Sequence, residues 1–71
     1  MRVVAIGERA RLEVYALAGV EILDAADPAT AERAWEELPA DVGLVLLSPA
    51  AQVALAERLA QKRLLWTVVP E

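Results

Sequence analysis

The feature that most constrains the fold of this chain is the apolar run of residues 42–47, which has no charged side chain at any position. Asp41 precedes it, and Ser48 and Pro49 follow it. A strand with one face in water alternates apolar and polar residues, whereas a run that is apolar on both faces is typical of a central strand in a parallel sheet covered by helices on both sides. The run therefore predicts an α/β protein.

Three further segments have the composition of strands. Residues 3–6 form a short, β-branched apolar run ended by Gly7, which predicts a second buried strand. In residues 20–23, Glu21 interrupts the apolar run and Asp24 closes it, which predicts a strand at the edge of the sheet. Residues 64–69 form the last predicted strand, and the strands alternate with helices throughout the chain.

Each predicted helix has a start signal and an apolar stripe. The first helix covers residues 8–18 and ends near Gly19, and the second and third start at Asp27-Pro28 and Ser48-Pro49, where a capping side chain precedes a proline. The first helix has an expected inward stripe of Leu12, Tyr15, Ala16 and Gly19, extended by Val14, Leu17 and Ala18. The second has Ala31, Ala34, Trp35 and Leu38. The third has Val53, Leu55, Ala56, Leu59 and Ala60, with the cations Arg58, Lys62 and Arg63 near its end.

The order of elements is βαβαβαβ, which predicts one Rossmann-like domain over residues 1–71 with a four-stranded parallel sheet, right-handed crossovers and helices on both faces. The charged strand belongs at an edge, so the strand order is expected to be 2-1-3-4. This order places the first helix alone on one face, where it cannot cover four strands. An under-covered apolar face usually marks a partner surface. We therefore predict an interface that involves Leu12, Tyr15, Ala16 and Trp66.

Composition excludes several classes of function. The chain of 71 residues has no Cys and no His, which removes disulfides, the commonest soft metal ligands and the usual base for a nucleophile. A net charge of −4 argues against nucleic acid as a partner, and no apolar run approaches the roughly 20 residues that span a bilayer. We expect no catalytic residue, no metal and no cofactor. A domain this small is marginally stable alone, which favours tight packing or association, including a homo-oligomer.

Ligands of open α/β sheets bind beyond the carboxyl ends of the strands, where the strand order reverses. The candidates at that point are Gly7, Glu8, Arg9 and Ser48. No glycine-rich phosphate-binding motif is present, so the alternative function at this point is a small-anion site built from helix amides and Arg9. A phosphoacceptor receiver domain shares the strand order, but it needs an acidic pair after the first strand and an Asp after the central one. Ser48 is better explained as a helix cap.

One family is similar to this chain along its whole length. The segment from Val3 to Glu8, a helix, and then Leu17-Ala18-Gly19-Val20 resembles the F subunits of the archaeal/vacuolar-type (V/A-type) ATPases, in which a strand ending in Ile-Gly-Asp leads through a helix to Leu-Ala-Gly-Val. The spacing matches without a gap, and Tyr15 falls where the family has an aromatic residue. Residues 41–47 and the closing Val68-Val69-Pro70 are also similar to strands of that family. Glu8, Arg11 and Val14 depart from its usual Asp, Thr and Gly.

The resemblance implies a role in a rotary motor. It implies a non-catalytic central-stalk subunit of a proton-translocating ATPase or ATP synthase that docks on the coiled-coil rotor subunit. Such a subunit is cytoplasmic and peripheral to the membrane. Family members continue into a C-terminal segment, so the resemblance implies a short form without it. The alternative is a stand-alone interaction or assembly domain of the same fold, such as a homodimer.

Overall fold

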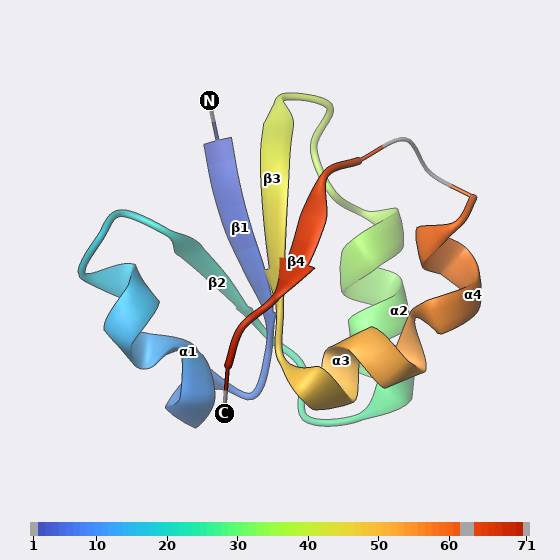
Figure 1. The fold of residues 1–71 in the computed structure, drawn as a ribbon, viewed down its shortest axis with the longest axis horizontal. Coiled ribbons are helices and arrows are strands. Elements are labelled where there is room, and N and C mark those ends of the chain that lie inside the picture. Colours follow the sequence, from blue (N-terminus) through green and yellow to red (C-terminus); the bar gives the residue numbers. More distant parts are fainter. Residues whose placement is uncertain (1, 62–63, 71) are drawn as a thin grey trace.

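The structure of this protein is a computed structural model that describes residues 2–61 and 64–70. Four parallel strands form one sheet in the order β2-β1-β3-β4 (Figure 1). The strands are β1 (Arg2–Gly7), β2 (Glu21–Asp24), β3 (Val42–Leu47) and β4 (Trp66–Val68). The helices are α1 (Arg9–Ala16), α2 (Pro28–Glu36), α3 (Pro49–Ala54) and α4 (Ala56–Leu59). The predicted fold class and strand order are confirmed.

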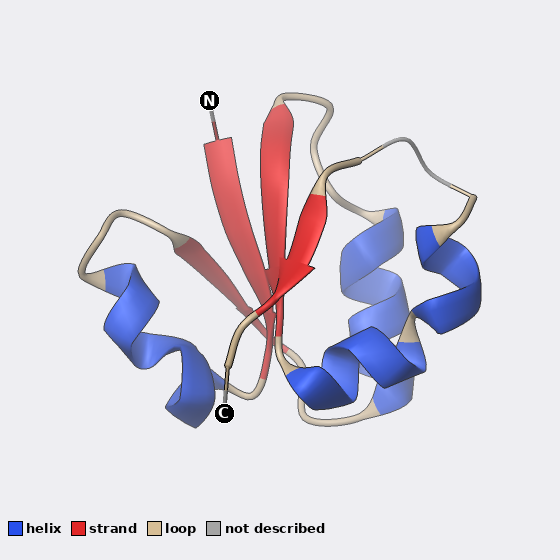
Figure 2. Cartoon of the chain, viewed as in Figure 1, coloured by secondary structure: helices blue, strands red, loops and turns tan. Residues whose placement is uncertain are grey.

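The helices divide unequally between the two faces of the sheet. Figure 2 shows α1 alone on one side and α2, α3 and α4 together on the other, as the strand order requires. The larger core cluster lies under α2–α4 and includes the fully buried Ile6, Val45, Leu47 and Leu55 together with Trp35. Trp35 is thus a core residue, as its place in the predicted inward stripe of the second helix indicated. The smaller cluster lies under α1 and consists of Ala5, Leu12 and Val69.

The inward stripe predicted for α1 was too wide. Leu12 is fully buried and Tyr15 is half-buried, but Ala16 is exposed, and Val14 and Leu17 are 65% and 89% exposed. The reason is that α1 has eight residues and lies mainly over β2 and β1, so only one side of a two-turn helix meets the sheet. Gly19 follows the helix with a φ of 85°, the left-handed conformation expected of it.

The third predicted helix is divided at Leu55 into α3 and α4. The backbone N–H of Leu55 still donates to Ala51, and that of Leu59 donates to Leu55, so the bend keeps these three residues on the sheet side. Val53, Ala56 and Ala60 are exposed, and their predicted burial was wrong. Residues four apart share a helix face. The buried set is therefore Ala51, Leu55 and Leu59, whereas Val53 lies two residues out of phase. Lys62 and Arg63 lie outside the described residues.

Strand β4 is shorter than the predicted residues 64–69, and all three of its residues are exposed at the sheet edge. Its flanks still bond to β3: Leu65 accepts a hydrogen bond from the N–H of Val45, and the N–H of Val69 donates to Leu47. Strand β2 forms the other edge, as its charged sequence predicted.

Candidate functional site

The carboxyl ends of β1 and β3 meet at Gly7 and Ser48, where the strand order reverses. Ser48 is fully buried; its hydroxyl donates to Glu8 Oε1 at 3.0 Å and accepts from the N–H of Ala51 at 3.1 Å. A Cβ added to Gly7 would stand 2.4 Å from the Ser48 Oγ, so only glycine fits there. The hydrogen-bonding capacity of Ser48 is used to cap α3 and to fix Glu8, which confirms the expected cap.

The carboxylate of Asp24 caps the first turn of α1, a role that the sequence analysis did not predict. The N–H of Arg9 donates to Asp24 Oδ1 at 3.1 Å, and Arg11 forms an ion pair with Glu8 at 3.3 Å. Asp24 closes β2 and at the same time caps a helix 15 residues earlier in the chain. Because two carboxylates gather here and the Arg9 amide already has an acceptor, the edge is poorly suited to an anion.

Two other hollows lie on the described surface. Beside Glu8, a cavity of about 60 Å³ lies between the starts of α2 and α3 and is lined mainly by alanines, with room for about two waters at ~30 Å³ each. A wider groove of about 420 Å³ runs between α2 and β2, over Leu23 and Ala34. Among the described residues, no group of three or more acidic side chains is placed to hold a metal ion.

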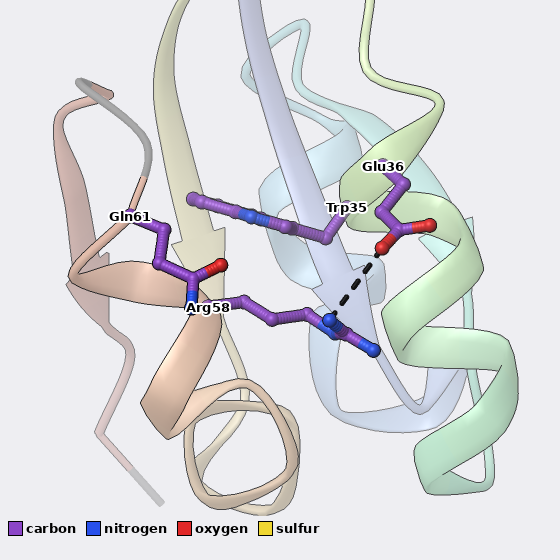
Figure 3. Close-up of a pocket in the computed structure, with 4 residues that line it drawn as sticks. All are labelled: Trp35, Glu36, Arg58 and Gln61. Carbon is purple, nitrogen blue, oxygen red and sulfur yellow. Dashed lines mark ion pairs between the residues drawn. The ribbon is translucent and has the colours of Figure 1, made fainter.

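Figure 3 shows the hollow between α2 and α4, about 220 Å³ in volume, which is lined by Trp35, Glu36, Arg58 and Gln61. The Arg58 guanidinium forms ion pairs with Glu36 at 3.5 Å and with Glu32 at 3.3 Å. These pairs join α4 to α2. The charges of the hollow are therefore already paired within the chain, and we assign it a structural role.

The face of the sheet that carries α1 is open over β3 and β4. Helix α1 contacts β2 and β1, and on the same face the next strands present Leu44 and Leu46, with Val3 beside them. All three are half-buried, and Leu65, which precedes β4, is 72% exposed. We call Val3, Leu44, Leu46 and Leu65 the open face. It is the under-covered apolar surface that the strand order predicted.

The four residues of the predicted interface do not lie together. Leu12 is fully buried between α1 and the sheet, so its side chain is not part of the exposed surface. Tyr15 packs against the smaller core cluster and is half-buried, and Ala16 is exposed. Trp66 pairs with Val45, a member of the larger cluster, so its side chain is directed to the α2–α4 side, where it is 37% exposed.

The sequence interpretation missed the residues of the open face itself. Leu44 and Leu46 were assigned to a strand buried on both sides, and the run of residues 42–47 contains no polar residue that would mark one side as different. The alternation of side chains along a strand could have identified these residues. Once Val45 and Leu47 are placed on the face covered by three helices, Leu44 and Leu46 must lie on the face covered by one helix.

Comparison with known protein families, with curated proteins and with solved structures found no match to this chain. Within the described part of the chain, no helix has both the length and the apolar character needed to cross a membrane.

Proposed function

We propose that this chain is a non-catalytic protein-binding domain, and that it acts as the central-stalk subunit of a V/A-type proton-translocating ATPase or ATP synthase. Its partner is the coiled-coil rotor subunit, which docks on the open face. The protein is then cytoplasmic and peripheral to the membrane through that complex. The observation that carries the proposal is the open face itself, a strip of half-buried and exposed aliphatic side chains beside a single helix.

The width of the open face suits a helical partner. On this side α1 makes its main contacts with β2 and β1, so the neighbouring strands β3 and β4 are covered only in part. Strands lie about 4.8 Å apart, so the strip is roughly one helix diameter wide, about 10 Å. A helix laid there packs between α1 and the β4 edge, and it completes the helical layer that the chain lacks.

The carboxyl edge supports a non-catalytic role. Glu8, Ser48 and Asp24 each have a hydrogen-bond partner in the framework, and these partners are helix caps or neighbouring side chains. The alternative of a small-anion site lacks support, because the Arg9 amide is bound to a carboxylate. The alternative of a stand-alone interaction domain uses the same open face with a different partner.

Co-purification of this chain with the coiled-coil rotor subunit encoded in the same genome tests the proposal. We expect a stable complex with the unmodified chain and at least about tenfold weaker binding for Leu44→Lys, because a charge at the centre of an apolar interface is desolvated on docking. Val53→Lys is the matched control: Val53 is 73% exposed and belongs to α3 on the opposite face. Both variants need a circular-dichroism melt to show that they fold.

Failure of the unmodified chain to bind the rotor subunit would end the ATPase assignment. Equal binding by Leu44→Lys and the unmodified chain would exclude the open face as the docking surface. Binding of the chain to another helical protein, with the same loss for Leu44→Lys, would favour the stand-alone interaction domain.

A further inference from the structure

The outer edge of β4 presents unpaired backbone groups. Backbone groups of successive residues in a parallel strand point to opposite sides. Leu65 and Val69 bond to β3 through their carbonyl and amide, so the amide and carbonyl groups of Trp66 and Val68 point away from the sheet. No described strand lies beyond β4, and two donors and two acceptors therefore line an exposed edge.

The two edges of the sheet differ in how they are protected. On β2, the exposed Glu21 and Asp24 bracket a strand of four residues, and charged side chains on an edge strand oppose pairing with another chain. From residue 64 to residue 70, the β4 edge has no charged side chain. It instead exposes Leu65 at 72% and Trp66 and Val68 at 37% each. An uncharged apolar edge is the kind that recruits another strand.

The β4 edge is complementary to itself. If two copies of β4 run antiparallel about a two-fold axis at Thr67, Trp66 lies opposite Val68 of the second copy, and the reverse pair follows by symmetry. Both residues have outward backbone groups, so each pair exchanges two hydrogen bonds in the manner of a hydrogen-bonded antiparallel pair. Aromatic side chains opposite β-branched ones are favourable cross-strand neighbours. Thr67 then faces its own copy as a non-hydrogen-bonded pair.

We propose that two copies of this chain associate through β4, antiparallel and about a two-fold axis at Thr67, so that their sheets become one continuous sheet. The occupant of the β4 edge is thus a second copy of the same chain. The assembly closes at two, because a two-fold interface uses the same patch on both copies and leaves the acidic β2 edges outermost. The net charge of −4 on each copy opposes further growth. This inference goes beyond the proposed function and uses the backbone edge of β4, which borders the open face at Leu65.

A single cysteine tests the register, because the chain has no native Cys. In a non-hydrogen-bonded antiparallel pair the Cα atoms lie about 4.5 Å apart, within the range that a disulfide bridges. We expect Thr67→Cys to form a disulfide dimer under mild oxidation at least about tenfold faster than Leu17→Cys. Leu17 is the C-cap residue of α1, is 89% exposed and meets its copy only by diffusion.

A second variant tests whether the disulfide depends on backbone hydrogen bonds between two β4 strands or on random collision of the two chains. Proline at position 68 removes an outward N–H that β3 does not use, and proline is tolerated on an edge strand of this kind. In the Thr67→Cys background, Val68→Pro should lower the rate of disulfide formation to that of Leu17→Cys. A circular-dichroism melt checks that this double variant folds. Sedimentation equilibrium of the unmodified chain should show a mass that rises toward twice 7.7 kDa with concentration.

Three results would overturn the inference. One is a Thr67→Cys rate no faster than that of Leu17→Cys. Another is a rate that Val68→Pro leaves unchanged in a folded protein. The third is a monomer mass throughout the micromolar to millimolar range. None of them bears on rotor binding, which is measured with Leu44→Lys.

Discussion

The two faces of the sheet show how differently one strand can be used. Under α2–α4, the residues Ile6, Val45 and Leu47 are fully buried and surround Trp35. On the other face, Leu44 and Leu46 of the same β3 strand are half-buried beside a single helix. Adjacent residues of one apolar run thus have different roles. One set is buried in the larger core, and the other remains partly exposed.

The difference follows from the order of the strands. The first crossover runs one way along the sheet and the later ones run the other way, so right-handed connections send one helix to one face and the remainder to the opposite face. The closed face buries the aromatic and aliphatic side chains that stabilise the domain. The open face contributes less to stability, and substitutions on it are expected to affect binding more than folding.

Replacing one aromatic side chain on each face should give the largest contrast. Trp35→Ala removes a fully packed indole and should lower the free energy of unfolding by about 3–5 kcal/mol, from a total of about 4–10 kcal/mol for a domain of this size. Tyr15→Ala removes a half-buried ring and should cost about 1–2 kcal/mol. Urea denaturation followed by circular dichroism measures both values. Equal costs would contradict the division into a closed and an open face.

A substitution at Gly7, the last residue of β1, should lower the free energy of unfolding nearly as much as Trp35→Ala does. Gly7→Ala places a Cβ 2.4 Å from Ser48 Oγ at a φ of 154°, and steric overlap with backbone strain should cost about 3 kcal/mol. Adding Ser48→Gly removes the nearest atoms, so the double variant should be less damaged than the sum of the two single changes. Strict additivity of the two free-energy changes, measured by urea denaturation, would show that this contact does not limit position 7.

Loss of the Ser48 hydroxyl alone should have an intermediate effect. Ser48→Ala leaves the N–H of Ala51 without its cap and Glu8 without its donor, and such changes cost about 1–2 kcal/mol. Ser48→Thr keeps the hydroxyl but adds a methyl group at a fully buried site, so its cost measures overpacking and not the loss of the hydrogen bonds. Urea denaturation of the three proteins compares them. If alanine is as stable as serine, the buried hydroxyl has no net stabilising role.

Periodicity and turn chemistry were sufficient to predict most of the fold. The run of residues 42–47, the charged residues of β2 and the two cap-proline pairs predicted the strand order and the helix starts. The phase of the third helix was mispredicted at Val53, because an alanine-rich segment gives several faces similar hydrophobicity. Long-range contacts were also missed: the carboxylate of Asp24 caps α1 across 15 residues of sequence, and no local pattern encodes such a partner.

The smallest predicted effect concerns the local cap at the start of α2. The N–H of Thr30 donates to Asp27 at 2.8 Å and lowers the pKa of this carboxyl below its usual value. A lowered folded pKa means stabilisation that is complete above the unfolded value, near 4, and is lost as the pH falls through the folded value. The stability difference between the unmodified chain and Asp27→Asn should therefore shrink as the pH is lowered from 6 to below 3.

Urea denaturation at several pH values measures this difference, with Glu13→Gln, an exposed carboxylate change on α1, as the control. Because Asn also caps helices well, the substitution keeps the cap and removes only its titration. The dependence on pH then reports the charge of Asp27 and not the loss of α2. A difference that stays constant from pH 6 to below 3 would show that the local cap holds its helix without help from that charge. Helix α2 would then depend on the cap hydrogen bond itself and on its buried residues, chiefly Trp35.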